Sequence, residues 1–252
     1  MTILEATILG IIQGFTEFLP ISSSGHLVLG QAILGIEQPG NEFEILVHLG
    51  TLASVLVIFY NDIKSLILSL ASKKTQIFIM YILIGTLPAV AIGLGFKDLI
   101  YSLFENVTAV GGALIFTGVV LFGSSFANRQ DKEHSFLTCI LIGCAQAMAI
   151  IPGISRSGMT ISAALFLGLS AKEAARFSFL LAIPAIGGAG LLTALDVSGG
   201  FQMPIPVALA GLTSSFAVGV VALKWLLGWL EQGKFHYFGI YCFAVGLITL
   251  VV

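Results

Sequence analysis

The chain has 252 residues, of which 57% are hydrophobic and only 10% are charged, and its mean hydropathy is +1.04. A soluble domain carries about a quarter charged residues, so this composition excludes an ordinary water-soluble protein. The formal net charge of −2 and the lack of basic runs give no indication of a nucleic-acid partner. The composition therefore predicts a protein whose partners are membrane lipids.

Apolar segments follow one another along the first half of the chain. The first covers residues 5–36 but is interrupted at Pro20–Gly25, which leaves two arms that are each too short to cross a bilayer. Longer apolar stretches follow near 43–61, 77–96 and 107–126. We expect a re-entrant helical hairpin and then three transmembrane helices, because an interrupted helix is tolerated in a membrane only where protein covers it.

The second half of the chain has the same order of segments. Residues 135–168 are apolar and are interrupted at Pro152–Gly158, and further apolar stretches lie near 174–195, 205–230 and 235–252. The sequence thus predicts an all-α polytopic membrane protein with six transmembrane helices and two re-entrant hairpins.

The two interrupted segments align without a gap at a constant offset of 133 residues. The identical residues are Gly10, Gln13, Ile21, Ser22, Ser24, Gly25, Leu34 and Gly35 against Gly143, Gln146, Ile154, Ser155, Ser157, Gly158, Leu167 and Gly168. We interpret this match as an internal duplication within one membrane domain of residues 1–252, with a first repeat at 1–130 and a second at 131–252.

Each repeat crosses the membrane three times, and an odd number of crossings inverts the second repeat relative to the first. The two hairpins are then expected to enter from opposite faces and to meet near the midplane. Lys and Arg residues are enriched in cytoplasmic loops, which sets the orientation. The predicted inner side collects Lys64, Lys73, Lys74, Arg129, Lys132, Lys172, Arg176 and Lys234, and the outer side only Lys97. Both termini are therefore expected outside.

The first hairpin carries an unusual set of polar residues for so apolar a chain. Gln13 and Glu17 are four residues apart and so share one helix face. A carboxylate beside an amide oxygen predicts a hard divalent cation, Mg²⁺ or Ca²⁺. His26 offers a group that exchanges a proton near neutral pH, and either Ser23 or a water molecule is a candidate nucleophile.

The second hairpin carries Arg156, whose guanidinium suits phosphate oxygens. Each interruption is expected to end at the N-terminus of a new helix, and two such N-termini facing inward form an anion site. The residues predicted to bind phosphate there are Ser22, Ser24, Ser155, Arg156, Ser157 and Thr160. A cation, a proton-transfer group, hydroxyls and a guanidinium together indicate phosphoryl transfer.

Structural roles compete with these interpretations. Glu17 either binds the cation or pairs with Arg156 across the hairpins, and a pair that opens for substrate satisfies both. The serines other than Ser23 are better explained as helix caps than as reactive groups. The alternative role for His26 is that of a hydrogen-bonded helix residue without a part in catalysis. His48 lies inside the first expected span, and we interpret it as structural or supporting.

Two long motifs resemble those of the undecaprenyl-diphosphate phosphatases, or bacitracin-resistance proteins. They are Gln13-Gly-Phe-Thr-Glu-Phe-Leu-Pro-Ile-Ser-Ser-Ser-Gly-His26 and Pro152-Gly-Ile-Ser-Arg-Ser-Gly-Met-Thr160, supported by Val47-His-Leu-Gly-Thr51 and Ala175–Pro184. The resemblance covers essentially the whole chain. It implies hydrolysis of a C55 polyprenyl diphosphate to the monophosphate and phosphate, dependence on a divalent metal, and an inverted repeat with two re-entrant hairpins.

The motifs of the family carry over onto particular positions here. The resemblance implies cation binding by Gln13 and Glu17, a reactive serine at Ser23, a catalytic histidine at His26 and a phosphate contact at Arg156. This chain has Gln where the family pattern allows Glu at the first position, so the cation has one carboxylate fewer. The motifs leave the nucleophile open between Ser23, His26 and water. An active site that opens to the outer face is also implied only by the family.

Other functions fit parts of the pattern. Inverted repeats with broken helices are typical of transporters, so a transporter or flippase of an anionic lipid or small anion is the alternative, and a structural scaffold is the least favoured. The acid-phosphatase-like lipid phosphatases are excluded, because they require a histidine at the position of Ser162. A homodimer remains open.

Overall fold

The computed structural model describes residues 1–36, 42–96, 99–100, 103, 106–127, 131–196 and 203–251, and every regular element in these ranges is helical. The helices are α1 (Ile3–Phe18), α2 (Ser23–Leu34), α3 (Glu42–Ile58), α4 (Tyr60–Leu68), α5 (Lys73–Gly95), α7 (Val107–Gly123), α8 (Phe136–Met148), α9 (Arg156–Phe166), α10 (Ala171–Asp196), α11 (Ile205–Glu231) and α12 (Phe238–Val251), with 3₁₀ helices η1 (Ser124–Phe126) and η2 (Phe235–Tyr237). The prediction of an all-α polytopic protein is confirmed.

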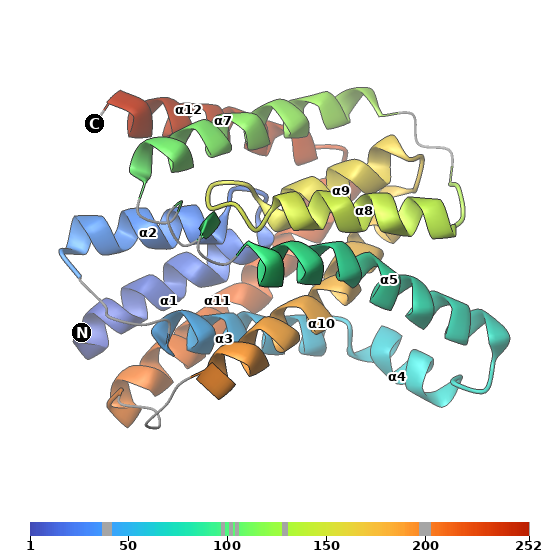
Figure 1. Ribbon diagram of the computed structural model, residues 1–252, viewed down its shortest axis with the longest axis horizontal. Coiled ribbons are helices and arrows are strands. Elements are labelled where there is room, and N and C mark those ends of the chain that lie inside the picture. The colour runs from blue at the N-terminus through green and yellow to red at the C-terminus, as the bar shows by residue number, and fades with distance from the viewer. Residues whose placement is uncertain are drawn as a thin grey trace.

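The two interrupted segments each form a pair of short helices that pack against each other, α1 with α2 and α8 with α9 (Figure 1). The interruptions have a local cause. Pro20 has no N–H to continue α1, and Ser22 begins α2 as its N-cap by accepting a hydrogen bond from the N–H of Gly25 at 3.4 Å. Ser155 caps α9 in the same way, with the N–H of Gly158 at 3.1 Å.

The two interruptions meet in the middle of the molecule (Figure 1). The N–H of Gly153 in the second hairpin donates to Oγ of Ser22 in the first at 3.1 Å. Their backbones are close enough that a Cβ added to Gly25 would lie 3.3 Å from Cα of Gly153. The hydroxyl of Thr117 on α7 donates to the carbonyl of Gly153 at 3.0 Å and so supports the second interruption from behind. The expected meeting of the hairpins is thus present.

Glycines allow the first helix of each hairpin to cross a long helix closely. Gly10 of α1 packs on Gly211 of α11, and Gly143 of α8 packs on Gly85 of α5; in both crossings an added Cβ would collide with the facing backbone. Gly10 and Gly143 are equivalent at the offset of 133 residues. The two halves of the chain therefore use equivalent positions for equivalent contacts.

Within the described ranges, four helical segments are long and apolar enough to cross a membrane: Lys73–Gly95, Val107–Phe126, Ala171–Leu192 and Ile205–Glu231. The expected span at 43–61 differs from its prediction, because α3 ends at Ile58 and the chain bends by 69° into α4. The bent pair makes a fifth candidate span. The last expected span is one of the shorter apolar helices, Phe235–Val251.

The chain after the bend is helical rather than a loop. The charged connection between this span and the next, expected from sequence at Asp62 to Lys74, begins inside helix α4, whose residues 60–68 are all at least partly exposed. Phe59 marks the bend with φ −94° and ψ 19°. Hydropathy alone did not predict this helix because its sequence mixes charged and apolar residues.

The two chain ends lie at one end of the helical bundle, and α4 with the beginnings of α5 and α8 lies at the other (Figure 1). Chain ends at the same end of the bundle fit an even number of crossings, as the prediction of six requires. Two residues of the charge count, Lys97 and Arg129, lie outside the described residues, as does the repeat boundary at residue 130. The orientation in the membrane and that boundary stay predictions.

Candidate active site

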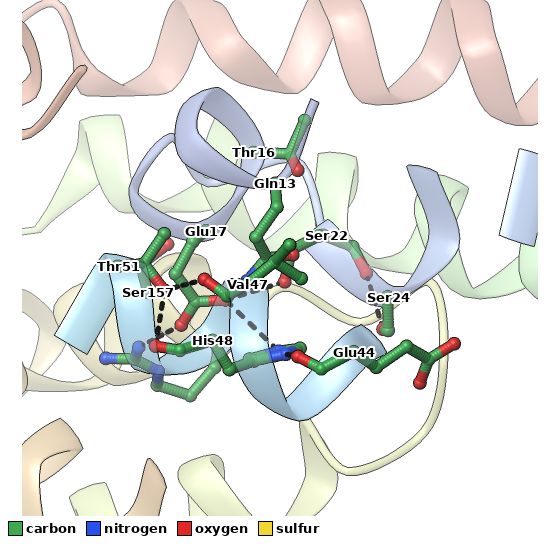
Figure 2. Close-up of polar contacts among 12 residues, drawn as sticks. Gln13, Thr16, Glu17, Ser22, Ser24, Glu44, Val47, His48, Thr51 and Ser157 are labelled. Carbon is green, nitrogen blue, oxygen red and sulfur yellow. Dashed lines mark hydrogen bonds and ion pairs between the residues drawn. The ribbon is translucent and has the colours of Figure 1, made fainter. Parts of the chain in front are cut away.

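Glu17, in the last turn of α1, is the centre of the polar cluster and is only 7% exposed. Its Oε1 accepts a hydrogen bond from Nη2 of Arg156 at 2.5 Å. Its Oε2 accepts from the hydroxyl of Ser23 at 2.7 Å and from the amide Nε2 of Gln13 at 3.1 Å. Nε2 of His48 lies 3.7 Å from the same Oε2. Figure 2 shows Gln13 and Glu17 reaching from α1 toward α3, which carries His48.

Two buried atoms beside this carboxylate have no hydrogen-bond partner among the residues that the structure describes. One is Oε1 of Gln13, an acceptor, and the other is Nη1 of Arg156, a donor. An unpaired polar atom in a buried site costs about 1–3 kcal/mol, so both atoms indicate a missing partner. The acceptor requires a donor or a cation, and the donor requires an anion.

Ser23 and Arg156 reach Glu17 from equivalent places. Each is the first residue of the helix that follows an interruption, α2 for Ser23 and α9 for Arg156. The first N–H groups of a helix have no intrahelical partner, and the helix dipole makes this end attractive to anions. In this structure the carboxylate of Glu17 is the anion held between the two side chains.

The remaining serines hold the two helix starts in place. Ser22 and Ser155 are N-caps, and each cap hydroxyl is within hydrogen-bond distance of the serine two residues later, Ser24 at 3.3 Å and Ser157 at 3.2 Å. The interpretation of these serines as helix caps is confirmed for Ser22 and Ser155, whereas Ser24 and Ser157 lie inside the first turns.

Ser22 has a backbone conformation that is unusual for a residue with a side chain, with φ 69° and ψ 102°. Such conformations cost of order 1–3 kcal/mol and persist only where the surroundings impose them. The bonds from the N–H groups of Gly25 and Gly153 to Oγ of Ser22 hold it there. The conformation directs the next residue, Ser23, toward Glu17.

Thr160 lies away from the carboxylate. Its fully buried hydroxyl donates to the carbonyl of Arg156 at 2.8 Å and is 2.6 Å from Oγ of Ser178 on α10. These contacts connect α9 to α10, so Thr160 supports the helix that carries Arg156. Its predicted contact with phosphate stays a prediction.

His26 is also directed away from Glu17. Its Nδ1 is 2.8 Å from the carbonyl of Ser22, and its Nε2 is 2.8 Å from the hydroxyl of Tyr241 on α12. The two rings stack with their centroids 5.6 Å apart. Since a carbonyl only accepts, Nδ1 carries a proton, and in the neutral ring the Tyr241 hydroxyl donates to Nε2.

Comparison with known proteins identifies the family. The family model described as bacitracin resistance protein BacA matches residues 6–248. The chain belongs to the BacA family. Its relatives include proteins named undecaprenyl-diphosphatase from Desulforapulum autotrophicum, at 39% identity over 100% of this chain and 98% of the relative, and from Halothermothrix orenii, at 42% over 100% and 98%. A third, from Korarchaeum cryptofilum, is 41% identical over 99% of both chains.

Few side chains are available here for the divalent cation that the sequence predicts. Among the described residues, no group of three or more His, Cys, Asp and Glu side chains is arranged to hold a metal ion. Gln13 and Glu17 nevertheless bring two oxygen-bearing side chains together, and Oε1 of Gln13 is buried without a partner. The residues fit a hard cation that takes most of its ligands from water and from phosphate oxygens.

Two residues enter the site that sequence reasoning did not assign to it. His48, interpreted from sequence as structural or supporting, lies against Glu17; its place in Val47-His-Leu-Gly-Thr51 was the available signal. Tyr241 gave no signal, because it lies in an apolar segment 215 residues after His26. The structure therefore brings together Gln13, Glu17, Ser23, His48 and Arg156, and it joins His26 to Tyr241 beside them.

Proposed function

We propose that this protein is a membrane-embedded hydrolase that releases phosphate from undecaprenyl diphosphate and leaves undecaprenyl phosphate. Membership of the BacA family and whole-length similarity to proteins named undecaprenyl-diphosphatase support this function. Hydrolysis of this lipid returns the carrier to cell-wall synthesis, and it accounts for bacitracin resistance in the family name.

The observation that carries the proposal is the pair of unpartnered atoms on the two sides of Glu17. Nη1 of Arg156 is a buried donor that a phosphate oxygen would satisfy, and Oε1 of Gln13 is a buried acceptor that a cation would satisfy. A diphosphate with its counter-cation supplies both partners. A purely structural Glu17–Arg156 pair leaves both atoms unexplained.

Ser23 is the best candidate nucleophile. Its hydroxyl already donates to Glu17 at 2.7 Å, so the carboxylate is in position to take the proton as Oγ attacks the terminal phosphorus. The bond between that phosphorus and the bridging oxygen breaks, and the lipid monophosphate leaves with the electron pair. Water then attacks the phosphorus of the phosphoserine, the bond between phosphorus and Oγ breaks, and Glu17 returns its proton to Oγ of Ser23 as phosphate is released.

Arg156 would bind the oxygens of the transferred phosphoryl group with its planar fork of donors. Because Nη2 now contacts Oε1 of Glu17, we infer that substrate binding separates this pair, in agreement with the dual role considered from sequence. Gln13 and Glu17 would hold the divalent cation, which neutralises phosphate charge when bound. His26 is hydrogen-bonded beside the reaction centre and is placed by Tyr241 rather than by Glu17.

The substrate has a long prenyl chain that stays in the bilayer while its head group must reach charged residues. Hairpins that end inside the bundle bring the polar cluster to the depth of the lipid, so the chain leaves sideways between helices. We propose that both termini lie outside, because the basic residues assigned to the inner side outnumber those assigned to the outer side. We propose that the site opens to the outer face on the ground of the family resemblance alone.

The test uses purified protein in detergent or nanodiscs and a prenyl diphosphate, with free phosphate measured. We expect release that stops with EDTA and resumes when a divalent cation is restored. Release should fall at least about a hundredfold in Glu17→Ala and in Arg156→Ala. Unchanged release in both variants would contradict the proposed site. Transbilayer movement of an unhydrolysed lipid with no phosphate release would instead support the transporter alternative.

A further inference from the structure

His48 has one ring nitrogen committed to the backbone and the other directed at Glu17. Its Nδ1 lies 2.7 Å from the carbonyl oxygen of Glu44, one turn earlier in α3. A carbonyl oxygen has only lone pairs, so Nδ1 carries the proton. In the neutral ring, Nε2 therefore presents a lone pair. A histidine whose Nδ1–H is held by a carbonyl while Nε2 is free has the arrangement typical of metal-ligating histidines.

Nε2 of His48 lies 3.7 Å from Oε2 of Glu17, which is too far for a hydrogen bond. A protonated ring would form an ion pair with Glu17, whereas a neutral ring offers the Nε2 lone pair and Glu17 an oxygen to one cation between them. Two ligands on one metal ion, each about 2.1 Å away, lie about 3.0 Å apart in octahedral and about 3.4 Å apart in tetrahedral coordination. The observed distance of 3.7 Å exceeds both of these separations by a few tenths of an ångström, and a small movement of the His48 side chain, which is 30% exposed, would bring Nε2 close enough.

Gln13 offers a third ligand next to the same oxygen of Glu17. Its Oε1 is buried without a partner, whereas its Nε2 is 3.1 Å from Oε2 of Glu17. Rotating the Gln13 amide by 180° exchanges the positions of its oxygen and nitrogen and puts the oxygen about 3.1 Å from Oε2 of Glu17. This is the separation of neighbouring ligands on one octahedral ion. Side chains of Gln13 and His48 thus both lie near one oxygen of Glu17, at distances that one cation can span.

We propose that His48 is a ligand of the divalent cation held by Gln13 and Glu17, so that the site takes a first-row transition ion such as Mn²⁺ in preference to Ca²⁺. Mn²⁺ accepts carboxylate, amide and imidazole ligands together, whereas Ca²⁺ prefers oxygen ligands throughout. The inference deepens the proposed function and rests on its cation. It changes the expectation of Mg²⁺ or Ca²⁺ made from sequence.

Electron paramagnetic resonance of bound Mn²⁺ tests the ligand directly. Purified protein in nanodiscs is titrated with Mn²⁺, and pulsed measurements detect the hyperfine coupling of a directly bound histidine nitrogen. We expect this coupling in the wild type and its loss in His48→Gln, which keeps an oxygen that can reach the ion. His26→Gln is the matched control, because His26 contacts Ser22 and Tyr241 instead, and it should keep the coupling.

Competition between ions gives a second readout. The ratio of the dissociation constants for Ca²⁺ and Mn²⁺ should fall about tenfold or more in His48→Gln, since only Mn²⁺ loses a favoured ligand. Absence of nitrogen coupling from the wild type, its persistence in His48→Gln, or no Mn²⁺ binding would each overturn the proposal. Coupling without any phosphate release would overturn the proposed function and leave the ligand standing. Metal-dependent phosphate release without the histidine nitrogen coupling would overturn the proposed ligand and leave the proposed function standing.

Discussion

Ser23 and Arg156 hold the two oxygens of one carboxylate from equivalent positions of the two hairpins. The Ser23 hydroxyl contacts Oε2 of Glu17 and the Arg156 guanidinium contacts Oε1, and the two positions are separated by the repeat offset of 133 residues. After a duplication, divergence at this one position would give a hydroxyl at the start of α2 and a positively charged guanidinium at the start of α9. The proposed nucleophile and the proposed phosphate clamp thus occupy equivalent positions of the two hairpins.

The pair of Glu17 and Arg156 should show strong coupling in stability. Both side chains are mostly buried, at 6% and 15% exposure, so Arg156→Ala leaves an unpaired buried carboxylate and should cost about 3–5 kcal/mol of unfolding free energy. The double variant Glu17→Gln with Arg156→Ala should recover part of this loss. Unfolding in detergent, followed for the four proteins, measures the coupling. Additive losses would show that the pair is not formed.

The hydroxyl of Ser23 should be required for turnover. Ser23→Ala removes the group that contacts Glu17, and phosphate release should fall at least about a hundredfold. Ser24→Ala is the matched comparison, because that hydroxyl contacts only Ser22 among the hydrogen bonds described, and it should lose less than about tenfold. A phosphorylated Ser23 peptide, found by mass spectrometry after rapid quenching, identifies the nucleophile. Equal losses in the two variants argue for attack by water.

Tyr241 should orient His26 through its hydroxyl. Tyr241→Phe keeps the stacked ring but removes the donor to Nε2, which should lower turnover about five- to tenfold, the equivalent of one hydrogen bond of about 1 kcal/mol. Nitrogen NMR of His26 should report a changed tautomer population in this variant. Tyr237→Phe, on the neighbouring 3₁₀ helix, serves as control. An unchanged His26 spectrum in Tyr241→Phe would rule out this role.

Ser22 offers a test of backbone strain at the meeting point of the hairpins. Ser22→Ala loses the bonds from Gly25 and Gly153 and keeps the unfavourable φ of 69°, whereas Ser22→Gly loses the same bonds but adopts that φ freely. We expect the alanine variant to be less stable than the glycine variant by about 1 kcal/mol. Thermal unfolding of both proteins in one detergent gives the comparison. The reverse order would mean that the strain is absent.

The crossing of α8 over α5 should tolerate no side chain. Gly143→Ala puts a methyl group into the backbone of Gly85, and the helices must separate, which should lower the melting temperature strongly or abolish folding. Gly112→Ala is the control, since an added Cβ there meets nothing within 4 Å. It should be neutral or slightly stabilising in the same thermal assay. A stable Gly143→Ala protein would disprove the close crossing.

The sequence by itself determined the features that depend on a few neighbouring residues. Hydropathy predicted the long helices, Pro20 and Pro152 located the interruptions, and Ser22 and Ser155 were recognisable as caps, because each signal is encoded within one or two turns. The repeat offset and the long motifs indicated which residues belong to one site. The family followed from the same motifs and is supported over residues 6–248.

Only the tertiary structure decided how those residues meet. It set which oxygen of Glu17 faces Arg156, brought His48 to the same carboxylate, joined His26 to Tyr241 and turned Thr160 toward Ser178. These contacts depend on helix packing between segments up to 215 residues apart, and packing is set by the combined shapes of many side chains. No local pattern reports that combination. The pairing of Glu17 with Arg156 could be considered from the motifs, but the contacts of His48 with Glu17 and of Tyr241 with His26 could not.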